Sequence, residues 1–243
     1  LDENLISVAM EGSYLDLQDA IDAAQPGDVL QICPGDYYGA VVIDTDLTLD
    51  GYGSAASVLY GNLDSATVFV DGANVTISNL LITDGLAFQA LGTPFDGGGG
   101  ITVLGADTFV LAYTVVQENE GAIAGGIHVQ ADHVEIEYSS IYSNECWIET
   151  GGIDIEGAST VELFESSISA NIGTEVGGLK IGPDPAVVEA SSANGIAGNE
   201  SEYGVGGMEL SAGTTWTGGV VYDNVGLVAG GGLVGYWQTS GFT

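Results

Sequence analysis

Glycine pairs recur along this chain at a nearly constant step, and this feature constrains the fold more than any other. The second glycines of six pairs are separated by 26, 26, 26, 29 and 25 residues, and the pairs open similar phrases such as GGITV, GGIHV and GGIDI. A period of about 20–50 residues is the signature of a repeat architecture. The six second glycines are Gly100, Gly126, Gly152, Gly178, Gly207 and Gly232.

Apolar residues alternate with polar ones in three short stretches of each repeat. Alternation with period two is typical of strands with one buried face, whereas a helix would need a period of about 3.6 residues. Strands this short need partners in the neighbouring repeats, so the sequence predicts an all-β parallel β-helix with three strands and about 26 residues per coil. In one repeat the alternating residues are Ile153, Ile155, Val161, Leu163 and Ile168.

Equivalent apolar positions recur in successive repeats, which predicts that like residues stack over like. Seven residues separate the first stack of the second strand from the stack of the third strand. The first stack of the second strand is predicted to contain Val75, Phe109, Val134, Val161 and Thr214. The position two residues later holds Ile77, Leu111, Ile136, Leu163 and Trp216. The third strand supplies Ile82, Val116, Ile141, Ile168, Ile196 and Val221.

An asparagine closes each coil, and we expect its role to be structural. Asparagine tolerates left-handed backbone, and stacked amides can hydrogen-bond to one another. A catalytic role is the weaker interpretation because every coil has such a residue. The paired glycines are expected to supply positive φ at a corner. The asparagines are Asn119, Asn144, Asn171, Asn199 and Asn224.

The N-terminal part of the chain departs from the repeat. Residues 15–24 place their apolar side chains roughly on one helical stripe. A helix here would cover the open end of the first coil, where an exposed strand edge is a hazard. We expect a single domain over residues 1–243, with an N-terminal strand and cap over 1–28 and coils over 29–243.

The C-terminal residues show no comparable cap, which suggests that something else covers the last coil. The chain could continue there, or coils could stack head to tail into a filament, since a contact that does not close on itself propagates. The stretch LISVAM, residues 5–10, could add a strand to a neighbouring molecule. The predicted assembly residues are Leu5, Ile6, Val8, Tyr236 and Trp237.

The charge balance excludes several kinds of partner. Thirty-four carboxylates face one lysine, Lys180, and no arginine, so the formal net charge is −33. Nucleic acids and anionic lipids need basic residues to neutralise their phosphates, so neither is an expected partner. No run approaches the roughly 18 apolar residues of a membrane span, so no membrane insertion is expected.

Carboxylates are hard oxygen ligands that suit calcium, the only cofactor that the sequence suggests. No EF-hand spacing is present, so weak and dispersed binding is the expected form. Cysteine and histidine show no shared ligand spacing, and Cys33 and Cys146 are expected to be unpaired thiols. The candidate calcium ligands are Asp44 with Asp46, and Glu145 with Glu149.

Two parts of the chain resemble the right-handed parallel β-helix superfamily of pectin-lyase-like folds. Residues 17–53, LQDAIDAAQPGDVLQICPGDYYGAVVIDTDLTLDGYG, resemble its N-terminal segment. The repeated GGI-x-V and S-I-x-x-N phrases of residues 99–232 resemble the non-catalytic members, which are bacterial secreted and surface proteins. The resemblance implies a right-handed β-helix and an extracellular or cell-surface location.

Relatives that act on pectin use arginine or lysine beside carboxylates, and this chain has no arginine. We therefore expect no enzyme activity but a structural β-helix protein, with a glycan-active or glycan-binding protein as the alternative. A hydrolase of neutral glycans would need only two carboxylates about 5 to 9.5 Å apart. Pairs that could be proposed are Asp154 with Glu209, about 10 Å apart, and Glu135 with Glu162, about 5 Å apart.

Two further features bear on binding. The outward positions of the first strand are expected to form a solvated ladder of charges that helps to fix register. The alternative is an acid–base pair of His128 and Asp154. The longest interruption of the repeat, residues 86–97, carries Phe88 and Phe95 and could bind carbohydrate. The ladder comprises Thr102, His128, Asp154, Lys180 and Glu209.

Overall fold

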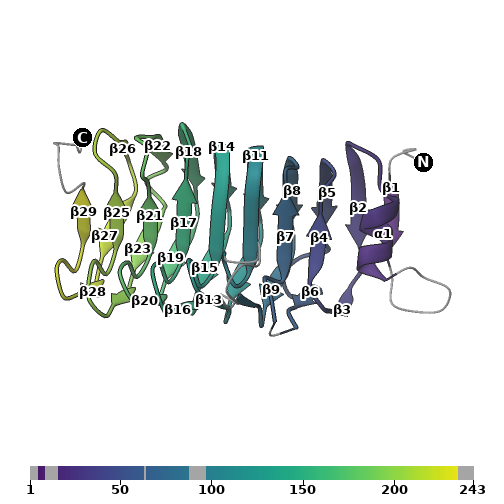
Figure 1. Ribbon diagram of the computed structural model, residues 1–243, viewed down its shortest axis with the longest axis horizontal. Coiled ribbons are helices and arrows are strands. Elements are labelled where there is room, and N and C mark those ends of the chain that lie inside the picture. The colour runs from purple at the N-terminus through teal and green to yellow at the C-terminus, as the bar shows by residue number, and fades with distance from the viewer. Residues whose placement is uncertain (1–4, 9–15, 63, 88–96, 235–243) are drawn as a thin grey trace.

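Successive windings of the chain lie side by side along one axis, with helix α1 at one end of the row and strand β29 at the other (Figure 1). This computed structural model describes residues 5–8, 16–62, 64–87 and 97–234. Neighbouring strands pair in parallel along the row. The expected all-β parallel β-helix with three sheets is confirmed.

The three sheets run along the described coils. The 15 strands of the largest are β1 (Leu5–Val8), β2 (Asp28–Ile32), β4 (Val41–Ile43), β5 (Leu47–Asp50), β7 (Val68–Asp71), β8 (Val75–Ser78), β11 (Ile101–Ala112), β14 (Ile127–Glu137), β17 (Ile153–Glu156), β18 (Thr160–Phe164), β21 (Leu179–Ile181), β22 (Val187–Ala190), β25 (Met208–Leu210), β26 (Thr215–Thr217) and β29 (Gly232–Val234). The 8 strands of the second are β3 (Gly35–Tyr38), β6 (Ser57–Tyr60), β9 (Leu81–Thr83), β12 (Val115–Gln117), β15 (Ser140–Tyr142), β19 (Ser167–Ser169), β23 (Gly195–Ala197) and β27 (Val220–Tyr222). The 6 strands of the third are β10 (Leu86–Ala87), β13 (Glu120–Gly121), β16 (Glu145–Cys146), β20 (Ile172–Gly173), β24 (Glu200–Ser201) and β28 (Val225–Gly226).

The largest sheet covers two faces of the rod because β11 and β14 pass continuously from one face to the other. We call the two faces A and B. Face A contains β4, β7, β17, β21, β25 and β29, and face B contains β1, β2, β5, β8, β18, β22 and β26. The first halves of β11 and β14 belong to face A and their second halves to face B. A register shift between Val103 and Ala106 marks the corner.

Apolar residues from all faces fill the interior of the rod in stacked rows. The row predicted for the third strand is confirmed, because each of its members is the Cα partner of the next. The rows that start at Val75 and Ile77 also follow the predicted order as far as Val161 and Leu163. Like residues therefore lie over like, as the repeat requires.

The predicted place of Trp216 is wrong by two residues. Trp216 is the partner of Val188, which is the partner of Val161, so Trp216 occupies the row predicted for Thr214. The strand ends early because Gly218 and Gly219 follow it with φ of +79° and +68°. These left-handed glycines turn the chain before a residue reaches the next row.

The paired glycines provide space and do not supply the expected positive φ. Neither Gly151 nor Gly152 has a left-handed φ. A Cβ on Gly152 would lie 2.3 Å from the carbonyl oxygen of Gly178, and a Cβ on Gly151 would lie 2.5 Å from the backbone carbon of Ile172. The pairs recur because successive coils bring backbone against backbone at this corner.

The five asparagines form a continuous ladder of side-chain amides. In each step Nδ2 donates to the Oδ1 of the asparagine one coil further on, at 3.0 Å between Asn144 and Asn171. The backbone N–H of Asn144 donates to the same Oδ1 at 3.0 Å. The expected left-handed backbone lies one residue earlier, as at Ser143 with φ of 55° and Ala170 with φ of 52°. The remaining amide contacts join Asn119 to Asn144, Asn171 to Asn199 and Asn199 to Asn224.

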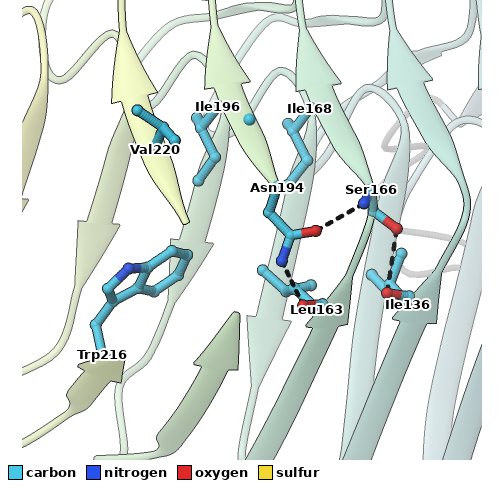
Figure 2. Close-up of a pocket in the computed structure, with 9 residues that line it drawn as sticks. Ile136, Leu163, Ser166, Ile168, Asn194, Ile196, Trp216 and Val220 are labelled. Carbon is cyan, nitrogen blue, oxygen red and sulfur yellow. Dashed lines mark hydrogen bonds between the residues drawn. The ribbon is translucent and has the colours of Figure 1, made fainter. Parts of the chain in front are cut away.

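A second polar ladder, which the sequence analysis missed, lies at another corner. The N–H of Thr114 donates to Ser139 Oγ at 3.1 Å, and the N–H of Ser139 donates to Ser166 Oγ at 3.2 Å. Asn194 takes the next place and accepts from the N–H of Ser166 at 2.6 Å, as Figure 2 shows. Ser166, Asn194 and Trp216 line a small, mostly apolar cavity (Figure 2). Its volume is about 10 Å³, so it holds no ligand larger than one water molecule.

Helix α1 (Leu17–Ala23) forms within the predicted segment and is shorter than expected. The side chain of Asp16 accepts from the N–H of Asp19 at the helix N-terminus, and Leu17, Ala20 and Ile21 are buried. Gln18 reaches the edge of β4, where its amide exchanges two hydrogen bonds with the backbone of Val42. No helix among the described residues is long and apolar enough to cross a membrane.

Candidate functional site

The outward residues of face A form one row across five strands. Register places Thr102 opposite His128, and His128 opposite Asp154. Asp154 is opposite Lys180, and Lys180 is opposite Glu209. The structure therefore brings together the whole ladder predicted from the sequence.

The expected exposure of this ladder to solvent is wrong for three of its members. Thr102 and Asp154 are 0% exposed and His128 is 1% exposed. The cover comes from the residues that precede the face A strands from β11 onward, which pair with one another from coil to coil through isolated bridges. Thr150 belongs to this cover, and its Oγ1 donates to Asp154 Oδ2 at 3.0 Å. We call this layer the outer cover; its bridging residues are Gly98, Ala124, Thr150, Val176, Val205 and Ala229.

Lys180 makes the only ion pairs recorded among the described residues. Its Nζ lies 3.1 Å from Asp154 Oδ2 and also pairs with Glu149 Oε2. Burial opposes the charge of the amine, but the two carboxylates outweigh it and raise the pKa of Lys180 above its ordinary value. The positive charge is therefore held firmly, and two negative groups already neutralise it.

Asp154 is a carboxyl group in an unusual environment. Burial raises its pKa to about 6, although Lys180 and the hydroxyl of Thr150 favour the ionised form. Its Oδ2 receives both of these contacts, while its Oδ1 is buried without a hydrogen-bond partner. Only one of the two carboxyl oxygens of Asp154 is therefore satisfied by hydrogen bonds.

His128 lies beside Asp154 without bonding to it. Both ring nitrogens are buried and lack hydrogen-bond partners. Burial lowers the pKa of His128, against the influence of Glu156 and Glu149, so the ring is neutral near pH 7. The acid–base pair considered from the sequence is adjacent in register, but the outer cover closes it off from solvent and from any substrate.

A surface hollow of about 400 Å³ opens where the outer cover leaves Lys180 and Glu209 half-buried. Burial raises the pKa of Glu209, Lys180 opposes this effect and Glu175 adds to it. Trp147 lies two residues before Glu149 in sequence and is 37% exposed, but it is not among the residues that line the hollow. The hollow is lined by Glu149, Glu156, Lys180, Ile181, Gly182, Pro183, Glu209 and Ser211.

The candidate calcium ligands occupy separate places. Asp46 Oδ1 accepts from the N–H of Asn74 at 2.7 Å, and Asp44 accepts from Thr45 Oγ1 at 3.3 Å. Glu145 is exposed on β16, whereas Glu149 pairs with Lys180. Within the described ranges, no three histidine, cysteine, aspartate or glutamate side chains gather closely enough to hold a metal ion.

Glu135 and Glu162 are direct partners on face B, and Asp154 and Glu209 lie two strands apart on face A. Cys33 and Cys146 are free thiols, as expected. Residues 5, 6 and 8 belong to β1, which pairs with β2 of the same chain. Phe88, Phe95, Tyr236 and Trp237 lie outside the described residues.

Glu149 and Thr150 are the residues of this site that the sequence analysis missed as partners of the ladder. The sequence predicts Glu149 only as a calcium ligand, and this residue lies 31 positions before Lys180. No local spacing links the two residues, because their contact depends on how the outer cover stacks. The one available signal was that a lone lysine in so acidic a chain needs carboxylates close by.

The family model described as "Right handed beta helix region" matches residues 31–201. A penultimately deglycosylated pectin methylesterase from Aspergillus niger has a TM-score of 0.54 and 15% sequence identity, over 100% of this chain and 92% of that chain. The deglycosylated form of that enzyme has a TM-score of 0.52 and 16% sequence identity, over 90% of this chain and 82% of that chain. At such identities the likeness shows the fold alone. No curated protein matches the sequence.

Proposed function

Because the chain belongs to the right-handed β-helix family, as its sequence resemblance predicted, we propose that it is a glycan-binding β-helix protein. The hollow around Lys180 carries this proposal. It presents the polar side chains of Lys180, Glu209 and Ser211 on a rigid sheet. Ammonium, carboxylate and hydroxyl groups held on a rigid surface are suited to the hydroxyls of sugars, which both donate and accept hydrogen bonds.

The class of ligand is also supported by the solved structures of similar fold. Both are pectin methylesterases, and we take from them only that a β-helix of this kind serves as a platform for a glycan. Their reaction is not transferred to this chain. The location that suits this function is extracellular or at the cell surface, where polysaccharides are encountered.

Binding without catalysis is the form that the contacts favour. Asp154 and His128 are closed off beneath the outer cover, so neither can act on a bound sugar. Lys180 is engaged by Glu149 and Asp154, and the sequence has no arginine to replace it. A polyuronate would meet an acidic hollow on a chain of net charge −33, so acidic glycans are disfavoured.

The test is a binding screen with a matched variant. Immobilised neutral, acidic and amino-sugar polysaccharides are incubated with the protein, and retained protein is measured alongside any release of reducing ends or methanol. We expect retention without product. A Glu209→Gln variant should lose retention, because Glu209 lines the hollow. The proposal would be contradicted if the protein were retained on none of the glycans. It would also be contradicted if substitutions in the hollow left its retention unchanged.

Head-to-tail assembly is a second candidate, favoured by one observation. In the described part of the chain, the largest sheet begins at β1 and ends at β29, and each pairs along one edge only. An unpaired edge can accept a strand from another molecule. Electron microscopy with and without calcium tests this candidate, and only monodisperse particles under both conditions would argue against it.

A further inference from the structure

We propose that Lys180 and Asp154 form an intramolecular amide bond, with Glu149 as the group that takes a proton from the amine. The bond would link the side chains of β17 and β21, which are neighbouring strands of face A. This inference goes beyond glycan binding and does not depend on it. It rests on three side chains that the structure brings into contact and on the burial of one of them.

The amine of Lys180 is held between two carboxyl groups. Its Nζ lies 3.1 Å from Oδ2 of Asp154 and also contacts Oε2 of Glu149. The carbon to be attacked is one bond beyond Oδ2, and the register of β17 and β21 keeps the two residues opposite each other. Well-oriented groups within one molecule react as if at effective concentrations of about 10⁵–10⁸ M. Condensation of an amine with an acid, which water disfavours between separate molecules, is therefore accessible here.

Asp154 has the environment that the attacked acid requires. Its side chain is 0% exposed, and burial raises its pKa to about 6, so more of it is uncharged at a given pH than of an ordinary aspartate. The uncharged acid is the form that an amine can attack. Thr150 Oγ1 donates to Oδ2 at 3.0 Å, and this hydrogen bond would stabilise the negative charge that develops on Oδ2 during the attack.

Glu149 is the described residue placed to accept the proton of the amine. A lysine is a nucleophile only in its uncharged form, and the raised pKa of Lys180 makes loss of this proton the costly step. Glu149 contacts Nζ directly, so the proton can pass along this contact. Glu209 also lies opposite Lys180 in register, but the ion pairs recorded among the described residues go to Glu149 and Asp154. His128, on the other side of Asp154, is neutral and buried.

The reaction needs no other reactant. It begins with Asp154 as the uncharged acid, its proton on Oδ1, and a proton moves from the ammonium of Lys180 to Glu149. Nζ then forms a bond to the carboxyl carbon, and one electron pair of the C=O bond moves to Oδ2. When this double bond re-forms, the bond from the carbon to Oδ1 breaks, and Oδ1 leaves as water with a second proton that Nζ releases. Nζ keeps one hydrogen, Glu149 keeps the first proton, and one water molecule is lost.

The structure describes the reactants. The stability and the titration of the ion pair belong to this unreacted form, since a chain that has reacted carries neither the lysine charge nor the Asp154 carboxyl group. The side chains of Lys180 and Glu149 are 23% and 31% exposed, so the released water can leave through the hollow. The bond would lock one coil to the next and leave Glu209 and Ser211 in the wall of the hollow.

The experiment is mass spectrometry of the intact chain during incubation of the folded protein. We expect wild-type chains to become lighter by one water molecule, and Lys180→Met and Asp154→Ala to lack this change. Glu149→Gln should react at least about a hundredfold more slowly, because a general base contributes about 10²–10⁴ in rate. Glu162→Gln removes an exposed carboxylate of face B and should match the wild type. Melting curves establish that each variant is folded.

The position of the link is measured on the wild-type protein, so this result does not depend on the folding of any variant. Asp–Gly sequences such as Asp50-Gly51 can also lose water by closing to a succinimide, and mass alone does not distinguish the two products. Phe164 lies between Asp154 and Lys180 in sequence. Chymotryptic digestion of the denatured protein therefore leaves both residues in one species only if they are bonded, and we expect this species.

The other outcomes each overturn a stated part of the inference. Full mass in every chain after prolonged incubation, without the linked species, would overturn the bond itself. Fragment ions that place the link on Glu149 would overturn the assignment to Asp154. Equal rates in the wild type and Glu149→Gln would overturn the role of Glu149. None of these results depends on retention by a glycan, so the proposed function stands or fails separately.

Discussion

Oδ2 of Asp154 lies 3.1 Å from Nζ of Lys180, and the two residues are direct partners on the neighbouring strands β17 and β21. One member of this pair is 0% exposed, and the other is the chain's single lysine. The pair also ties the outer cover to face A, because Thr150 donates to Asp154 and Glu149 pairs with Lys180. We therefore expect this contact to matter for stability as well as for the shape of the hollow.

The first prediction concerns the loss of the lysine. Lys180→Met should lower the free energy of unfolding by about 3 kcal/mol near pH 7, because removal of one partner leaves a buried charge uncompensated. Urea denaturation measures the change. The double variant Lys180→Met/Asp154→Asn is the control, since it removes the stranded charge and should recover much of the loss. If the single and double variants were equally stable, the ion pair would have no such role.

The second prediction concerns pH. The pKa of Asp154 is raised to about 6 in the folded state, above the value near 3.9 of an unfolded chain. The folded state therefore holds this proton more tightly, and the contribution of Asp154 to stability falls as pH rises from about 4 to about 6. The change over this window is about 3 kcal/mol for a shift of about two pH units.

Asp154→Asn should remove this part of the pH dependence. The other carboxylates titrate in both proteins, so the measured quantity is the difference in unfolding free energy between wild type and variant at successive pH values. We expect that difference to change across the window and to level off above it. A difference that stays constant from pH 4 to pH 7 would show that Asp154 titrates normally.

The third prediction concerns the asparagine ladder. Asn171 is 0% exposed, and its Oδ1 accepts from both the backbone N–H and the Nδ2 of Asn144 at 3.0 Å. Asn171→Ala would leave these two buried donors unsatisfied, at a cost of about 1–3 kcal/mol for each. Thermal unfolding compares this variant with Asn62→Ala, which removes an exposed asparagine and should have a smaller effect because its two hydrogen bonds are open to solvent. Equal effects would contradict a buried ladder.

The fourth prediction separates two kinds of glycine. Gly157 has φ of +73° and open space around it, so Gly157→Ala should cost only the backbone strain, about 1–2 kcal/mol. Gly152 has no left-handed φ, but an added Cβ would meet the carbonyl oxygen of Gly178 at 2.3 Å. Gly152→Ala should cost more than Gly157→Ala because the backbones of two coils must separate. Denaturant midpoints give the order, and the reverse order would contradict the close-approach explanation.

Much of the fold could be predicted because a solenoid repeats one local rule many times. The period of the glycine pairs and the alternation around residues such as Ile168 predicted the coil and its register. Where one coil departed from the rule, the prediction was wrong. Trp216 lies two residues away from its predicted place because Gly218 and Gly219 shorten its strand. The preceding coils lack this glycine pair, so a pattern derived from them could not predict the change.

The candidate site was predicted only in part. The sequence placed His128, Asp154 and Lys180 in one row, because register depends on the repeat alone. It did not predict that the row would be covered, because burial of an outward position depends on how the preceding turn lies over it. The same limit applies to Glu149, whose contact with Lys180 joins two residues 31 positions apart.

By itself, the sequence determined which residues share a row, since period and alternation are properties of the chain order. Only the tertiary structure decided which of those residues meet solvent. Thr102, His128 and Asp154 of the ladder are buried because stacked turns exclude water from them, and exclusion of water is what makes an unpaired charge such as that of Asp154 costly. The physical environment of a side chain is set by everything that packs around it, and most of those atoms are distant in sequence.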